Sequence, residues 1–299
     1  TETKARAANP VRGATTKTEV VPLEVGNYQG VIAEDGSALT NGFPALASVT
    51  FSAKAGAKRA LSARVTVAGR SYSFAADTWD ADGTDEARAV ATLTQVQRAG
   101  KAAYTNVFVV AVARGMTTND VAFAAGDAEV SLTMNVPDTR GTGVQEEISY
   151  KGTLFRDNAK IQAYLDAVTN FTGYYTVALA PQGTPAADGV PAGNGYLTLT
   201  VDNKGTVKVA GVLADGATKP TASVSGAALV LDDASANGYA LLVPVFMART
   251  PQCFGGTLRL YAREDGTVVV DSTESLAWNS DLAAATYAWF TSNRAVGTS

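Results

Sequence analysis

Hydrophobic and polar residues alternate with a period of two along much of this chain. The alternation is clearest in residues 48–52, 63–67, 129–134 and 206–209. Successive side chains of a β-strand point to opposite faces, so this period predicts strands with one buried face. Residues 202–205 and 263–266 carry Asp, Asn and Gly between such runs, which is typical of short hairpin turns. The pattern therefore predicts a mainly antiparallel, all-β chain.

One segment changes to the helical period. Residues 157–168 begin with Asp157, a capping residue, and place Ile161, Tyr164, Leu165 and Val168 on one helical face. We expect a short helix there, packed against the end of a barrel and joining the two halves of the chain. Residues 279–290 fit either a helix or a strand.

The two halves of the chain carry similar segments in the same order. Gly26–Ile32 is matched by Gly173–Leu179, roughly 147 residues later, and each segment places a Tyr two residues after its first Gly. A repeat at this spacing indicates tandem modules. Three further matches pair residues 47–51 with 197–201, 65–69 with 212–216, and 107–112 with 241–246.

The repeat and the strand pattern together predict two tandem homologous domains, each a β-barrel or a β-sandwich. Closure or double layering removes the exposed strand edges that an open sheet would present. We expect an N-terminal arm over residues 1–24, a first β domain over 25–155, a linking helix over 156–170 and a second β domain over 171–299.

Composition narrows the functional classes. Charged residues make up 17% of the chain, hydrophobic residues 46%, and the formal net charge is −4. No basic run supports nucleic-acid binding, and no apolar stretch has membrane-spanning length. A β-rich chain with few charges is typical of exported proteins. The absence of a visible signal peptide fits a mature protein from which it has been cleaved, or a trimmed chain.

The chain has no His and a single Cys, Cys253. Without His there is no Ser-His-Asp triad, no Cys-His pair and no common zinc site within this chain. We expect Cys253 to be a buried small hydrophobe, with a reactive or intermolecular thiol as the alternative. The expectation is therefore a protein that is not an enzyme and has no cofactor. A glycosidase would need two carboxylates converging from separate elements.

The segment from Asp77 to Glu86 is the densest acidic cluster. Asp80, Asp82 and Asp85 lie around a Gly turn and offer oxygen ligands of the kind that Ca²⁺ binds. The spacing does not match an EF-hand loop, so a solvated hairpin tip is the first interpretation and a weak Ca²⁺ site the second.

Trp79 in the same segment is the candidate for contacting sugars. An exposed tryptophan stacks on sugar rings, whereas a buried one fills a core or an interface. Both interpretations remain open from the sequence.

The carriers of the repeat are Gly26, Tyr28 and Gly30 in the first copy and Gly173 to Tyr175 with residues 197–201 in the second. A late aromatic strand follows at 276–278 in the second copy, where the first has Leu154 and Phe155 instead. This pattern resembles a loosely defined tandem β module of secreted and surface-exposed bacterial proteins. The resemblance implies export and a non-catalytic role at the cell surface, and it implies no ligand.

Two functions follow as hypotheses. The first is an exported structural protein that self-associates into a surface layer, filament or fibre. Its N-terminal arm, with Thr18, Val20, Val21 and Leu23, would complete the sheet of a neighbouring copy by strand addition. The alternative is a carbohydrate- or surface-binding adhesin that uses Trp79 to contact a surface glycan.

Overall fold

The computed structural model confirms that the chain is all-β, antiparallel and almost free of helix. It describes residues 25–35, 46–56, 58–67, 70–80, 88–99, 102–113, 127–136, 146–157, 162–181, 194–214, 216, 219–224, 227–231, 234–249, 252–272, 276–281 and 286–298.

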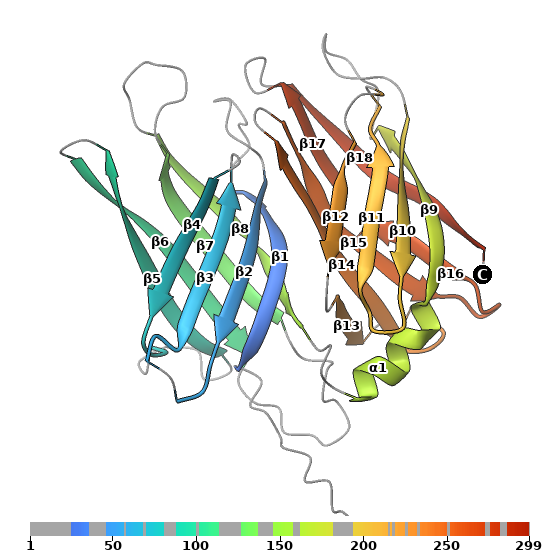
Figure 1. The fold of residues 1–299 in the computed structure, drawn as a ribbon, viewed down its shortest axis with the longest axis horizontal. Helices are drawn as coiled ribbons and strands as arrows, with labels where there is room; N and C mark the ends of the chain where they lie inside the picture. The colour runs from blue at the N-terminus through green and yellow to red at the C-terminus, as the bar shows by residue number, and fades with distance from the viewer. Residues whose placement is uncertain are drawn as a thin grey trace, which may run out of the picture.

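The first eight strands form a closed barrel in which each strand pairs with its neighbours along the chain and β1 pairs with β8 (Figure 1). The strands are β1 (Gly26–Glu34), β2 (Leu46–Ala53), β3 (Leu61–Val67), β4 (Arg70–Ala76), β5 (Arg88–Ala99), β6 (Ala102–Ala113), β7 (Asp127–Val136) and β8 (Glu146–Arg156). Of the two alternatives that the sequence left open, the barrel is the one that this part of the chain adopts.

Alternation along each strand separates the barrel's core from its outer face. On β3, Leu61, Ala63 and Val65 are buried, whereas Ser62 and Arg64 are exposed. Inward-pointing apolar residues and outward-pointing polar residues are what a period of two produces in a sheet with one dry face.

Aromatic rings cross the interior of this barrel. The ring of Phe51 lies 5.8 Å from Tyr28 and 6.3 Å from Phe108, and Phe108 lies 5.9 Å from Phe74. All four side chains are at most 2% exposed. The chain of contacts joins β1, β2, β6 and β4, so the middle of the barrel is filled by the protein's own side chains.

The remaining strands form one ten-stranded antiparallel sheet that curls around a second core. They are β9 (Gly173–Pro181), β10 (Gly195–Val201), β11 (Val207–Val212), β12 (Thr221–Val224), β13 (Ala228–Leu231), β14 (Tyr239–Arg249), β15 (Gln252–Ala262), β16 (Val268–Ser272), β17 (Leu276–Asp281) and β18 (Thr286–Thr298). Residues 279–281 and 286–290, within the segment that fitted either helix or strand, are strand. The predicted turns at 202–205 and 263–266 join β10 to β11 and β15 to β16.

Two pairs of strands in this sheet follow each other in the same direction. β12 pairs with β11 and β13 with β14, and an even number of antiparallel pairings separates β12 from β13 around the sheet. Likewise, β16 and β17 are both antiparallel to β15, along different stretches of it. Each pair therefore behaves as one strand with a break, and the ten strands occupy eight positions.

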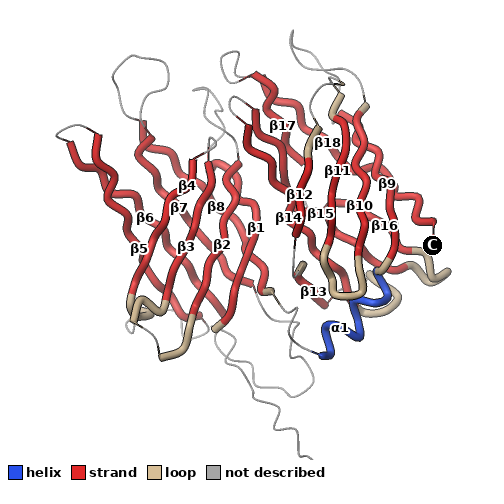
Figure 2. The backbone as a smooth tube through the Cα atoms, viewed as in Figure 1, coloured by secondary structure: helices blue, strands red, loops and turns tan. Residues whose placement is uncertain are grey.

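The predicted helix is shorter than expected and packs beneath the second sheet (Figure 2). α1 spans Gln162–Val168 and continues as a 3₁₀ turn, Thr169–Phe171, while residues 158–161 of the expected helix lie outside the described residues. Tyr164 and Val168, from the predicted apolar face, are buried in the core of this sheet, and Leu165 packs against it.

Side chains from β1 and β2 meet side chains from β14 and β15 where the barrel and the sheet touch. Leu46 and Cys253 form a small buried cluster there, and Val31, Ala33 and Phe246 pack against it. Cys253 is 2% exposed and is in no disulfide among the described residues, which confirms its interpretation as a buried small hydrophobe. It is buried by contact between the two parts of the molecule and lies outside the main core of either part.

Candidate functional site

Two rows of polar side chains cross the outer face of β1–β4. Strand register aligns Gln29, Thr50, Arg64 and Ser73 in one row and Asn27, Ser52 and Ser62 in the next. With Asp157, these residues line a cavity of about 400 Å³. Their strand neighbours Tyr28, Phe51, Ala63 and Phe74 point inward and are buried, so alternation places every polar group of the rows outside the barrel.

Arg64 is the cationic group of this cavity. Its side chain is exposed, and within the described part of the chain it forms no ion pair. Hydroxyl and amide groups surround it, and the Ser52 hydroxyl donates to Asn27 Oδ1 at 2.7 Å. The backbone N–H of Asp157 donates to the Asn27 carbonyl at 2.7 Å and holds this carboxylate at the margin of the cavity.

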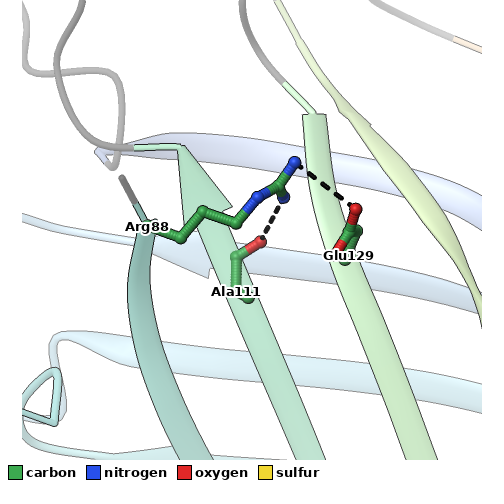
Figure 3. A network of polar contacts seen from close by, with 3 residues as sticks. All are labelled: Arg88, Ala111 and Glu129. Carbon is green, nitrogen blue, oxygen red and sulfur yellow. Dashed lines mark hydrogen bonds and ion pairs between the residues drawn. The ribbon is translucent and has the colours of Figure 1, made fainter. Parts of the chain in front are cut away.

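Arg88 shows what an arginine of the same barrel does when it has a structural role. Its Nη2 lies 3.4 Å from Glu129 Oε1, and its Nη1 donates to the Ala111 carbonyl at 3.2 Å (Figure 3). The side chain thereby links β5, β6 and β7 across the outer face. Arg64 forms no such ion pair among the described residues, so its guanidinium remains available to a carboxylate or phosphate.

The arrangement suits binding better than acid–base chemistry. A concave surface with several hydroxyls, two amides and one guanidinium can hydrogen-bond a ligand rich in hydroxyl groups and neutralise one acidic group. Of the residues that line it, Asp157 alone carries a carboxylate, whereas glycoside hydrolysis needs two.

A second cavity of about 220 Å³ lies next to the first, at the contact between barrel and sheet. Both are lined by Gln29 and Thr50, and the second also by Val224, Pro244 and Phe246. The ladder between β13 and β14 ends at Leu242, just before Pro244. Pro244 has no N–H to donate, so it is tolerated where β14 has no further ladder partner on that side.

Trp79 lies between the barrel's core and its surface. Its ring packs edge-on against Phe51 at 5.9 Å, and the side chain is only partly buried. It follows the end of β4, and the next residue, Asp80, bridges to Val90 on β5. Trp79 therefore covers a break in the sheet, and it does not line either of the cavities described above.

The other residues predicted from sequence fall mostly outside the described residues. Thr18, Val20, Val21 and Leu23 of the arm lie there, as do Asp82 and Asp85 of the acidic cluster. Asp80 is described and exposed, and its backbone N–H donates to the Val90 carbonyl at 2.7 Å. Across the described ranges, no three His, Cys, Asp or Glu residues come together as a metal site would require. Binding of Ca²⁺ stays a prediction.

Sequence reasoning missed the polar rows on β1–β4. The signal was present at alternate positions, because Ser62 and Arg64 stand between buried residues of β3. What the sequence could not give was the register that brings them beside Thr50 and Ser73 on the neighbouring strands.

The shifted pKa values lie away from this cavity and have structural causes. Burial raises the pKa of Tyr175 to about 12, and its hydroxyl donates to the Phe171 carbonyl at 2.7 Å. Burial also raises the pKa of Tyr164 well above its usual range, with Asp157 and Asp202 adding to the effect. Burial raises the pKa of Glu34 as well. None of these three side chains lines the 400 Å³ cavity.

Comparison with known proteins assigns this chain to no family. No family model matches the chain, and no curated protein matches it. A crystal structure from Bacteroides fragilis NCTC 9343, provisionally identified as an outer membrane protein, aligns with 92% of this chain and 97% of its own at 8% identity, with a TM-score of 0.27. A protein with unknown function from the DUF3598 family of Nostoc punctiforme PCC 73102 aligns with 91% and 96% at 10% identity, with a TM-score of 0.21. At these TM-scores neither likeness carries an argument about this chain.

The described helix is too short to cross a bilayer, and none of the described residues forms a long apolar helix of the kind that could.

Proposed function

We propose that this chain is a non-catalytic binding module of the cell exterior, and that the β1–β4 cavity recognises surface glycans that carry carboxylate groups. The observation that carries the proposal is the cavity of about 400 Å³ around Arg64, lined by hydroxyl and amide groups. A guanidinium binds a carboxylate through two parallel hydrogen bonds, and the hydroxyl rows match the many hydroxyls of a sugar chain. This is the alternative function expected from the sequence, with its site moved from Trp79 to Arg64.

The interior of the barrel supports a role for its outer surface. The aromatic side chains that cross it from β1 to β6 fill the space where a barrel of this size would otherwise hold a small ligand. Placement outside the cell rests on the low proportion of charged residues and the β-rich sequence, as set out above.

The test is a binding measurement with an acidic glycan. Isothermal titration with polygalacturonate oligomers should detect binding that Arg64→Ala weakens by about ten- to a hundredfold, since a hydrogen bond to a charged group contributes about 1.5–3 kcal/mol. Arg88→Ala is the matched control, because this arginine belongs to the same barrel and is already paired. Equal affinity of the wild type and Arg64→Ala would refute the proposal.

We also propose that the two halves of the chain are copies of one eight-position module. Among the described residues of the first barrel, β4 pairs with β3 along its length, and residues 70–80 pair with β5 only at Ala75 and Asp80. In the second sheet, β12 pairs with β11, and a separate strand, β13, pairs with β14. β1 and β9 both begin at a glycine with positive φ, Gly26 and Gly173, and β8 and β18 each close onto that first strand.

Two observations refine this proposal. Tyr28 and Tyr175, two residues after the opening glycines, are both buried. The sequence match of 107–112 with 241–246 does not fit it, because those segments lie in β6 and β14, the sixth and fifth positions. An experimental structure in which β1–β8 and β9–β18 fail to superpose with Tyr28 on Tyr175 would contradict the duplication.

Self-association into a surface layer, filament or fibre is the second candidate function. The observation that favours it is that β14 pairs with β13 only as far as Leu242, so residues 243–249 have no ladder partner on that side among the described strands and could accept an added strand. Deleting residues 1–23 should then abolish oligomers measured by light scattering. Unchanged oligomer size after the deletion would rule out strand addition by the arm.

A further inference from the structure

Two exposed tyrosines lie on one outer face of the second sheet, away from the Arg64 cavity. Tyr174 on β9 is 50% exposed and Tyr196 on β10 is 46% exposed. With Val96, they are the large hydrophobic side chains most exposed to solvent among the residues that the structure describes. Both alternate with buried residues, Tyr175 and Leu197, so both point outward from the same curled sheet.

Register fixes how far apart the two tyrosines lie. Tyr196 is the partner of Ala178, which lies four residues along β9 from Tyr174. At about 3.4 Å per residue and about 4.8 Å between strands, their Cα atoms are roughly 14 Å apart. Thr176 and Thr198 are cross-strand partners between them. The face thus has an aromatic ring at each end and hydroxyl groups in the middle.

Packing does not account for either exposed ring. Among the described residues, neither Tyr174 nor Tyr196 has a ring contact or a side-chain hydrogen bond, whereas the neighbouring Tyr175 is buried and donates to the Phe171 carbonyl. The exposed pair therefore contributes surface that the described part of the fold does not use.

The charge and size of this face indicate its occupant. Lys208, beside Thr200 on β11, is the charged residue among the described β9–β11 positions of the face, and no carboxylate lies there. Two half-exposed tyrosines offer on the order of 200 Å² of aromatic surface, far below the roughly 800 Å² per partner of a stable protein interface. Separate rings with hydroxyls between them suit a chain of neutral sugars, which stack on the rings and hydrogen-bond to the threonines.

We propose that the outer face of β9–β10 is a binding surface for an extended neutral polysaccharide, with Tyr174 and Tyr196 stacking on two sugar units that are not adjacent along the chain. This site is separate from the Arg64 cavity and takes a different ligand, so either proposal can fail while the other stands.

Affinity electrophoresis of the full chain in gels containing neutral polysaccharides (mannan, xyloglucan, mixed-linkage β-glucan) tests the proposal. The wild type should be retarded by at least one of them. Tyr174→Ala and Tyr196→Ala should each weaken that binding by about tenfold, and the double variant should weaken it further. Tyr174→Phe and Tyr196→Phe keep the rings and should retain binding within about threefold, as should Val96→Ala, an exposed control in the first barrel.

Other outcomes overturn the proposal. No retardation of the wild type by any of the three polymers would overturn it, as would equal retardation of the double alanine variant. If sedimentation velocity shows that the wild type self-associates and the double alanine variant does not, the face is a contact between copies of this chain. Arg64→Ala should bind the neutral polymer as the wild type does, and loss of binding in that variant would contradict two separate sites.

Discussion

The first barrel and the second sheet each contain a break in strand pairing, and each covers it differently. In the barrel, β4 pairs with β3 along its length. Among the described residues, the segment 70–80 pairs with β5 only at Ala75 and Asp80, and Trp79 packs on Phe51 beside the gap. In the sheet, β12 and β13 run in the same direction with a break between them, and Ala227 lies in that break.

The break in the second sheet is covered by a residue from outside the sheet. The Tyr164 hydroxyl, on α1, donates to the Ala227 carbonyl at 2.7 Å, and both residues are fully buried. A buried carbonyl without a partner is costly, so a break in a ladder needs a donor from elsewhere. The comparison teaches that an interrupted strand is tolerated when a large side chain both fills the gap and satisfies the freed backbone.

The largest effect is expected from truncating the two covering side chains. Tyr164→Ala removes a fully buried ring and the partner of Ala227, and it should lower the free energy of unfolding by about 3–5 kcal/mol. Trp79→Ala removes a partly buried ring and should cost about 2 kcal/mol. Urea denaturation of both variants measures the difference, and an equal or reversed order would break the comparison.

A pair of turn glycines tests whether Tyr164 is closely packed. Gly205 has a φ of 76° and Gly266 a φ of 79°, so an alanine at either position adopts a left-handed conformation at about 1–2 kcal/mol. A Cβ on Gly205 would also collide with the Tyr164 hydroxyl, whereas a Cβ on Gly266 meets nothing within 4 Å. Gly205→Ala should therefore destabilise by about 2–4 kcal/mol and Gly266→Ala by about half as much. Thermal or urea unfolding of the two variants would show no difference if Tyr164 could move aside freely.

Alkaline pH should weaken the second sheet through its buried tyrosines. The pKa of Tyr175 is raised to about 12 in the folded protein, so its stabilising contribution is complete below the ordinary value near 10 and is lost as pH rises from about 10 to 12. Each such residue makes the free energy of unfolding fall more steeply with pH, by up to about 1.4 kcal/mol per pH unit. Urea unfolding at a series of pH values should give a shallower decline for Tyr175→Phe. Tyr174→Phe is the control at an exposed position, and a Tyr175→Phe decline as steep as that of the wild type would count against the mechanism.

The smallest effect is expected from the ion pair that links β5 to β7. Arg88 and Glu129 lie 3.4 Å apart on the outer face, where Glu129 is well exposed. Surface pairs of this kind contribute about 0–1 kcal/mol and are screened by salt. A double-mutant cycle with Arg88→Ala and Glu129→Ala should give a coupling energy below about 1 kcal/mol that shrinks in 1 M salt. A larger value that does not depend on salt would make this pair a major contact of the barrel.

The local pattern of hydrophobic and polar residues was enough to predict the strands and part of the helix. Period-two alternation identified β2 and β3, Gly-containing turns identified the β10–β11 and β15–β16 hairpins, and the helical period identified the buried face of α1. These features depend on side-chain direction within a few residues, which the sequence encodes directly. The expectation that Cys253 is buried followed from its chemistry in the same way.

The candidate sites depended on contacts between distant parts of the chain. The Arg64 cavity exists because register places residues from four strands side by side, and one residue of slip would turn each row to the other face. Trp79, which the sequence marked for sugars, is held against Phe51, while Tyr174 and Tyr196 are left exposed.

The sequence by itself determined an all-β antiparallel chain with a short helix, because propensity and periodicity act over a few neighbouring residues. Tertiary structure alone decided that β1 meets β8, that β12 and β13 share one broken strand position, and that Tyr164 reaches Ala227 across 63 residues of sequence. Such pairings depend on the shape of the whole core, and many combinations of strands would satisfy the same local pattern. Which outward-facing residues become a site is therefore set by closure and register.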